Sequence, residues 1–249
     1  MKPKEDVEKA KRNAALEAVK HVKDGFILGL GSGSTVAYAA EEIGKRVKND
    51  KLHVKAVPTS YQAFMLAVKN GIPTTTLEEN PTIDLTIDGA DQIDENLNLI
   101  KGMGGALTRE KIVAAASKTI IIIADERKKV KILGENGQQL PIEVLPFAAS
   151  FVMRKLSQLG GKPKIRESSG KVGPVITDNG NFIIDVDFGL IKEPEKIEKK
   201  LKMVPGIVET GLFVDMADLV FLGKRNRVKK LEREKEKSLF SSDLQCKWI

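Results

Sequence analysis

Apolar residues follow two alternating patterns along the first 133 residues of the chain. Within residues 5–23, Val7, Ala10 and Ala14 are spaced three or four apart, which predicts a helix with one apolar face. Residues 26–30 form a short apolar run that predicts a buried strand. The same patterns predict further helices over 35–47, 60–70 and 108–117 and further strands over 53–57, 74–77, 84–88, 97–100 and 119–123. Short apolar strands that alternate with helices indicate a mostly parallel sheet covered on both faces.

The pattern changes after Leu133, where the turn-rich segment GENGQQLP ends the alternation. Beyond it we expect strands over 141–145, 163–167, 182–188 and 206–213 and helices over 147–159 and 193–202. This order, β-α-β-β-α-β, is that of a ferredoxin-like unit. Residues 218–223 are again fully apolar, so we expect the chain to return to the first sheet.

The sequence therefore predicts an α/β fold with a doubly wound, mostly parallel, Rossmann-like sheet and a smaller ferredoxin-like α+β domain. The expected divisions are a large domain of residues 1–133 plus 214–234, a small domain of 134–213, and a C-terminal extension of 235–249.

The net charge of +7 is concentrated near the C-terminus. Residues 224–237 hold eight Lys or Arg and three Glu, and residues 1–223 carry a net charge of only +2. Charges of mixed sign spaced three and four apart predict a solvated C-terminal helix and not a nucleic-acid-binding face.

Other features of composition argue against further classes of protein. The first thirteen residues are too charged for a secretory signal, and the apolar runs are far shorter than the roughly 20 residues that cross a bilayer. We therefore expect a cytoplasmic protein that binds neither membrane nor nucleic acid. One cysteine, Cys246, and two histidines, His21 and His53, argue against an intrachain disulfide and a Cys or His metal site, so we expect no metal and no cofactor.

Three loops that follow predicted strands carry candidate chemistry. The first is GLGSGST, residues 29–35, where free N–H groups at the start of a helix would favour a phosphate. It lacks the third glycine of a dinucleotide fingerprint and the lysine of a P-loop, and it could instead be a tight turn with a Ser or Thr cap.

The second loop is DGADQ, residues 88–92, which follows an apolar strand. Carboxylates at the carboxyl end of a parallel strand point toward the crevice where open α/β sheets bind ligands. Asp88 and Asp91 flank Gly89 and could both face one site, although Asp and Gly are also common in turns.

The third loop is KGMGGALTREK, residues 101–111. Lys101 could stabilise an oxyanion beside a glycine loop that allows close approach of a ligand. Glu110 lies in the first turn of the next helix, where the helix dipole alone favours an acid. The three loops together supply anion donors, paired acids, and a lysine with an acid, which favours one shared site.

Four segments in this order, GLGSGST, DLTIDGAD, LIKGMGGALTREKI and GPVITDNGNFIIDV, closely resemble ribose-5-phosphate isomerase of the A type. The resemblance runs from about Lys11 to about Leu231. It implies a doubly wound catalytic domain, a ferredoxin-like lid, and a homodimer or homotetramer. It also implies metal-independent interconversion of ribose 5-phosphate and ribulose 5-phosphate through an ene-diolate, in the non-oxidative pentose phosphate pathway.

The resemblance implies catalytic roles for four residues: Glu110 as the general base, Lys101 as the oxyanion stabiliser, and Asp88 and Asp91 as proton carriers. The residues expected to bind the sugar phosphate are Lys11, Ser32, Gly33, Ser34, Thr35, Asp88, Gly89, Ala90, Asp91, Lys101, Gly102, Met103, Gly104 and Lys128.

The sequence departs from the family pattern at three of these loop positions. Ser32 stands where a threonine is usual, and Gln92 stands where a glutamate is usual. Met103 replaces a glycine, which would cost about 1 kcal/mol if the position required a positive φ.

Two alternatives stay open at this point. One is another sugar-phosphate isomerase or deaminase on a related sheet, which would usually need a histidine base. His21 and His53 lie in a helix and at the start of a strand, away from the three loops. The other is a non-catalytic sugar-phosphate sensor, for which the discriminating observation is whether the protein converts ribose 5-phosphate to a ketose.

Overall fold

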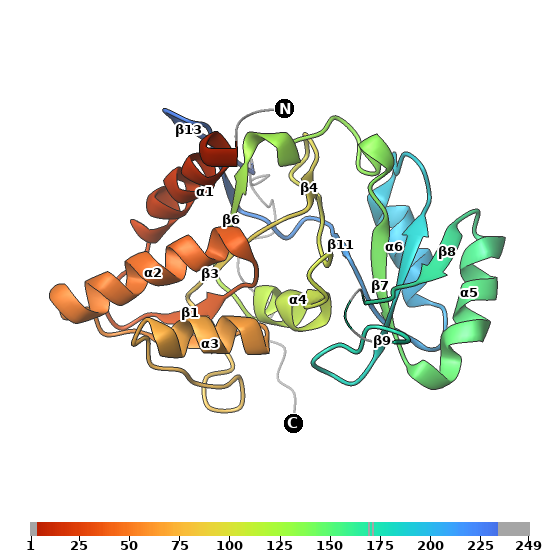
Figure 1. The fold of residues 1–249 in the computed structure, drawn as a ribbon, viewed down its shortest axis with the longest axis horizontal. Coiled ribbons are helices and arrows are strands. Elements are labelled where there is room, and N and C mark those ends of the chain that lie inside the picture. The colour runs from red at the N-terminus through yellow and green to blue at the C-terminus, as the bar shows by residue number, and fades with distance from the viewer. Residues whose placement is uncertain (1–3, 169, 171, 234–249) are drawn as a thin grey trace, which may run out of the picture.

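The computed structural model describes residues 4–168, 170 and 172–233 (Figure 1). The expected extension 235–249 and Cys246 lie outside the described residues. The helices are α1 Lys4–Val19, α2 Ser34–Asn49, α3 Tyr61–Lys69, α4 Leu107–Ala115, α5 Ala149–Gln158 and α6 Pro194–Lys202, with 3-10 turns at η1 Glu126–Lys128, η2 Glu135–Gly137 and η3 Pro146–Ala148. The strands are β1 Ile27–Leu30, β2 Lys55–Pro58, β3 Leu85–Asp88, β4 Gln92–Ile93, β5 Leu99–Ile100, β6 Ile120–Asp125, β7 Leu140–Val144, β8 Lys162–Ile165, β9 Phe182–Asp187, β10 Ile207–Thr210, β11 Leu212–Phe213, β12 Leu219–Gly223 and β13 Val228–Glu232.

The larger sheet has the strand order β13-β12-β6-β3-β1-β2, and all neighbours pair in parallel except β13 with β12. Strand β6 shows why both faces are buried. Ile121 and Ile123 pack in one core with α1 and α2, whereas Ile120 and Ile122 pack in another with α4 and β11. A strand that is apolar on both faces has no alternation, as a doubly covered parallel sheet requires. The predicted doubly wound sheet is confirmed.

The smaller sheet is antiparallel, with the order β10-β7-β9-β8. In β7, Leu140, Ile142 and Val144 pack against α5 and α6. Pro141 and Glu143 therefore lie on the opposite face, which is turned toward α4 in Figure 1. The predicted ferredoxin-like unit is confirmed, and the exact domain boundaries stay a prediction.

The predicted strand 206–213 is two strands in two different sheets. Strand β10 pairs with β7, and β11 pairs with β5 in a separate three-stranded sheet of order β11-β5-β4. Gly211 lies between them, where its N–H donates to Pro141 O at 2.7 Å and its carbonyl accepts from Lys101 N at 2.9 Å. A Cβ at this position would lie 2.3 Å from Lys101 O, so only glycine fits the crossing.

Two predicted elements are wrong. Residues 74–77 form only one isolated bridge, Thr74 to Ala56, because Pro73 has no N–H to pair and Thr75 donates its hydroxyl to Glu79 in a turn. In the predicted C-terminal helix, residues 228–232 instead form β13. The charges are spaced as in a helix, but the segment forms a strand because it pairs with the open edge of β12. Its exposed lysines are usual on edge strands.

The final strand of the parallel set, β12, lies beside β6, so the expected return of the chain to the first sheet is confirmed. Within the described residues, no helix combines the length and the apolar character needed to cross a membrane.

Candidate active site

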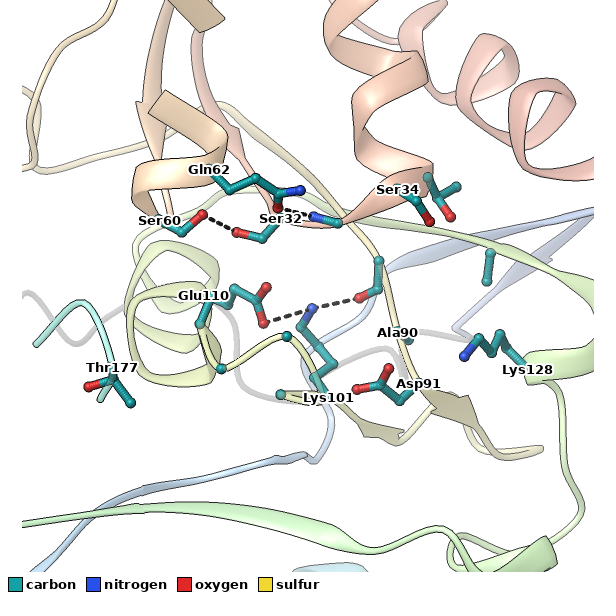
Figure 2. A pocket seen from close by; sticks show the side chains of 18 of the residues that line it. Ser32, Ser34, Ser60, Gln62, Ala90, Asp91, Lys101, Glu110, Lys128 and Thr177 are labelled. Carbon is teal, nitrogen blue, oxygen red and sulfur yellow. Dashed lines mark hydrogen bonds and ion pairs between the residues drawn. The ribbon is translucent and has the colours of Figure 1, made fainter. Parts of the chain in front are cut away.

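The carboxyl ends of β1, β2, β3 and β6 surround a cavity of about 560 Å³ (Figure 2). Its volume lies in the usual range for small-molecule sites. Of the residues expected to bind a sugar phosphate, those that line the cavity are Lys11, Ser32, Gly33, Ser34, Thr35, Gly89, Ala90, Asp91, Lys101, Gly102, Gly104, Lys128 and the expected base Glu110. Two of the expected residues do not line the cavity: Asp88 is buried, and Met103 is 45% exposed.

A buried charge cluster forms the wall between β3 and α4. Lys101 Nζ lies 3.0 Å from Asp88 Oδ2 and 3.1 Å from Glu110 Oε2, and it donates to Gly89 O at 2.6 Å. The three charged side chains are at most 6% exposed. Figure 2 shows the Lys101 and Glu110 side chains pointing toward each other at the edge of the cavity. All three donors of the ammonium group are thus fixed by the protein.

This cluster changes the acidity of two groups. Burial, followed by the charge of Asp88, raises the pKa of Glu110 from its usual 4.5 to about 8, although Lys101 beside it acts in the opposite direction. Burial opposes the charge of Lys101, but the carboxylates of Asp88 and Glu110 outweigh it and raise the Lys101 pKa above its usual range. Lys101 therefore stays charged at neutral pH, while Glu110 can exchange a proton there.

The turn from β1 to α2 packs directly on the cluster. Asp88 Oδ1 accepts from Ser32 N at 3.2 Å, and a Cβ on Gly31 would lie 2.0 Å from the same oxygen. Gly31 is therefore needed for the close approach of the turn to the acid. Gly33 takes φ +102° at the start of α2, which leaves the helix N-terminus open to the cavity. The Ser32 hydroxyl is 2.6 Å from the Ser60 hydroxyl, which also caps α3.

Two lysines face the cavity near this helix N-terminus. Lys11 Nζ donates to Ser34 Oγ at 3.1 Å and forms an ion pair with Glu8 at 2.8 Å. The ammonium group of Lys128, in η1, makes no hydrogen bond or ion pair with any residue that the structure describes, and its charge contributes to the lowered pKa of Asp125. The two cations and the N–H groups of α2 form a site suited to a dianion such as a phosphate monoester.

The glycine loop after β5 resolves the question raised by Met103. The positive φ angles fall on Gly102 and Gly105 and not on Met103, so the expected strain of about 1 kcal/mol does not arise. Met103 N donates to Asp91 Oδ2 at 2.9 Å, and Arg166 Nη1 donates to the carbonyls of Gly102 and Met103. Asp91 and a residue from the ferredoxin-like domain thus hold the loop from two sides.

Gln92, another departure from the family pattern, forms two hydrogen bonds with residues 134 and 135. Its Nε2 donates to Glu135 O at 2.7 Å and its Oε1 accepts from Gly134 N at 2.8 Å. A glutamate could accept the second bond but could not donate the first. Gln92 therefore anchors the segment that leads into the ferredoxin-like domain.

The sequence reasoning missed part of the lining. These residues are Ser60, Gln62, Gly105, Ala106, Ala124, Asp125, Arg127, Val175, Ile176, Thr177 and Asp178. Ser60 and Asp125 could have been found, because each lies at the carboxyl end of a parallel strand. Residues 175–178 lie in GPVITDNGNFIIDV, one of the four segments of the family resemblance, but neither their pattern nor their place in the predicted fold indicates that they reach the cavity.

No group of three or more His, Cys, Asp and Glu side chains within the described ranges could hold a metal ion. His21 and His53 do not line the cavity. The expected absence of a cofactor stays a prediction.

The model of the family described as ribose 5-phosphate isomerase A (phosphoriboisomerase A) matches residues 55–227. The ribose-5-phosphate isomerase A of Methanosarcina acetivorans is 48% identical over 225 residues, which cover 90% of this chain and 95% of the relative. The solved ribose 5-phosphate isomerase A of Methanocaldococcus jannaschii is 46% identical with a TM-score of 0.87, covering 90% of this chain and 99% of that one. A D-ribose-5-phosphate isomerase solved in complex with phospho-erythronic acid is also 46% identical, with a TM-score of 0.89 and coverage of 91% and 99%.

Proposed function

The chain belongs to the ribose 5-phosphate isomerase A family, and from this premise we propose that Glu110 moves the proton between C1 and C2 of its substrate. The protein is an aldose–ketose isomerase of the pentose phosphate pathway, which interconverts D-ribose 5-phosphate and D-ribulose 5-phosphate. The observation that carries the proposal is the pair of Glu110 Oε2 and Lys101 Nζ, buried 3.1 Å apart in the cavity wall.

The chemistry of the reaction requires a base and a stabiliser of negative charge. Removal of the proton from the carbon next to the carbonyl leaves an ene-diolate, whose oxygen carries the charge. Glu110, with its pKa raised to about 8, is well matched to take up and return this proton near neutral pH. Lys101 can stabilise the charged oxygen without moving, because Asp88 and Gly89 already hold its ammonium group.

The two aspartates have different positions and so, we propose, different roles. Asp88 is buried against Lys101 and acts by holding it, rather than by touching the sugar. Asp91 lines the cavity on the other side of Gly89 and Ala90, where it could carry a proton between the sugar hydroxyls and assist ring opening. The sequence interpretation treated the two acids as one pair that shares a proton.

The phosphate group is proposed to bind between Lys11, Lys128 and the N-terminus of α2, with Ser34 and Thr35 as hydroxyl donors. A relative solved in complex with phospho-erythronic acid supports a phosphorylated ligand in this family. Binding at this end would hold the reacting carbons against Glu110.

Three expectations from the sequence stay proposals: a homodimer or homotetramer, a cytoplasmic location, and a small domain of residues 134–213 that acts as a lid. The lid assignment is supported by residues 175–178, which come from this segment and line the cavity.

The decisive experiment replaces Glu110 with Gln, which keeps the size of the side chain but cannot accept a proton. We expect kcat to fall by roughly 10²–10⁴, the range for lost general-base catalysis, with little change in substrate affinity. The matched control is Glu5→Gln, since Glu5 is an exposed acid in the first turn of α1. If Glu110 only complements the helix dipole, both variants will lose about 0.3–1 kcal/mol of stability and keep near-normal turnover.

A further inference from the structure

Glu143 is a buried acid that the proposed chemistry does not use. Its side chain projects from the central strand β7 on the face opposite α5 and α6, and the residue is 0% exposed. None of its hydrogen-bond partners in the described part of the chain is cationic, although fully buried glutamates are usually paired. Its carboxylate is instead surrounded by hydrogen-bond donors from two other segments.

One of these donors belongs to the helix that carries the proposed base. Thr108 Oγ1 donates to Glu143 Oε2 at 2.6 Å, and this bond is buried. Thr108 is in the first turn of α4, two residues before Glu110. The start of α4 has no side-chain cap, because Ala106 occupies the N-cap position. The contact with Glu143 is therefore a specific attachment for this turn.

The remaining donors belong to the loop of the ferredoxin-like domain that borders the cavity. Glu143 Oε1 accepts from Thr177 Oγ1 at 2.9 Å, Asn179 Nδ2 at 3.0 Å and Asn181 Nδ2 at 2.8 Å. Thr177 and Asp178 line the cavity. One side chain thus holds two segments of the site: the base helix, α4, through Oε2, and the cavity loop, residues 177–181, through Oε1.

The same loop is also tied to the larger domain. Arg109 donates to Asn179 Oδ1 at 2.7 Å and to Asp178 O at 2.8 Å, and Asp178 Oδ2 accepts from Tyr61 N at 2.7 Å. The loop therefore has a defined position against α3 and α4. If the bonds to Glu143 were lost, these contacts would keep the loop on the larger domain, and its position relative to the cavity would change.

We propose that Glu143 is a positioning residue for the isomerisation, which fixes the Glu110 helix and the cavity loop to one carboxylate. The proposal rests on the role proposed for Glu110. A glutamate suits this place because both of its side-chain oxygens accept hydrogen bonds. A glutamine would instead turn an N–H group toward one set of donors. Displacement of a catalytic group by about 1 Å can reduce the rate about 100-fold, so the attachment matters for turnover.

The experiment separates the two attachments and spares Glu143, whose replacement could prevent folding. Thr108→Val removes only the bond to the base helix, and we expect kcat to fall about 10- to 100-fold with KM nearly unchanged. Thr108→Ser restores the hydroxyl and should recover most of the parent kcat. Thr177→Val removes one of the three bonds between Glu143 and the loop that contains residues 177–181, and it leaves those from Asn179 and Asn181. It should raise KM roughly 3- to 10-fold, with a smaller effect on kcat.

The matched control is Thr75→Val, since Thr75 is a buried threonine that donates to the carboxylate of Glu79 outside the cavity. It should lose thermal stability without a change in kcat or KM. The proposal is overturned if Thr108→Val and Thr177→Val behave like this control, because Glu143 would then serve stability alone. Glu110→Gln is measured in parallel: near-normal turnover in that variant would refute the base assignment itself, whatever the threonine variants do.

Discussion

The two ends of the cavity differ in how many hydrogen-bond and ion-pair partners the protein supplies to their lysine side chains. At the reacting end, the Lys101 ammonium group contacts Asp88, Glu110 and the Gly89 carbonyl, and its side chain is 4% exposed. At the proposed phosphate end, the Lys128 ammonium group makes no hydrogen bond or ion pair within the described residues, and Lys11 is held by the half-buried Glu8 and the exposed Ser34. The charged groups at the reacting end therefore have their partners before substrate binds. At the phosphate end, a bound anion would supply the missing partner of Lys128.

The difference indicates how binding and chemistry are divided between the two ends. A lysine that is already held by the protein can stabilise a transition state without reorganisation, which is where electrostatic catalysis is strongest. A lysine with free donors gains its partners only when a phosphate arrives, so it contributes to binding. Variants at the reacting end should therefore change kcat, and variants at the phosphate end should change KM.

Among the variants that test this division, the largest effect should come from Lys101→Met, which removes the stabilising charge. We expect kcat to fall by roughly 10²–10³, the usual cost of losing one group that stabilises an oxyanion. The variant should also lose stability, because Asp88 and Glu110 are left buried without a cation. Lys111→Met is the matched control, since Lys111 is also largely buried and pairs with Glu198 and Glu209 outside the cavity. A folded Lys101→Met protein with the turnover of the control would contradict the proposed role.

A smaller effect, confined to KM, should follow from Lys128→Ala. Loss of one hydrogen bond to a charged group should raise KM for ribose 5-phosphate about 10- to 100-fold and leave kcat within a few-fold. The control is Lys131→Ala, because Lys131 is exposed and lies outside the cavity lining. If kcat fell while KM stayed constant, the division between the two ends would be wrong.

The smallest expected effect is the change in kcat/KM of the unmodified protein with pH. Glu110 must be deprotonated to act as a base, and its pKa is raised to about 8. The rate should therefore rise with pH and level off above about pH 8, and kcat/KM should fall roughly five-fold from pH 8 to pH 7. The apparent value belongs to the coupled cluster with Asp88 and Lys101. A rate that stays constant down to pH 5 would place the base elsewhere.

Much of the fold and the site could be predicted because both depend on strand ends. A run such as residues 119–123 indicates a buried strand, and the loops after parallel strands must meet at one edge of the sheet. This geometry placed Ser34, Asp91 and Lys101 around one cavity before any distance was known. The resemblance to a family then supplied the role of Glu110, which its position in a helix does not show.

The remainder depends on contacts between distant segments. Residues 228–232 have the charge spacing of a helix, yet the open edge of β12 makes them a strand. Glu143 interrupts an apolar strand and carries no local sign of its partners, which are 34 or more residues away in the chain. Thr177 reaches the cavity only because two domains pack together. The periodicity of apolar residues within one segment does not indicate which distant segment it will contact.

The glycine at the crossing between β10 and β11 has a consequence for motion. Gly211 is hydrogen-bonded on one side to Pro141 in the ferredoxin-like domain and on the other to the backbone of Lys101. The two domains are thus joined by a continuous run of backbone bonds that passes through the lysine of the reacting end. A hinge that opened the domains at this crossing would have to break these bonds and displace Lys101. We therefore expect movement of the proposed lid to leave this crossing intact and to open the cavity through loops at its rim, such as residues 175–178.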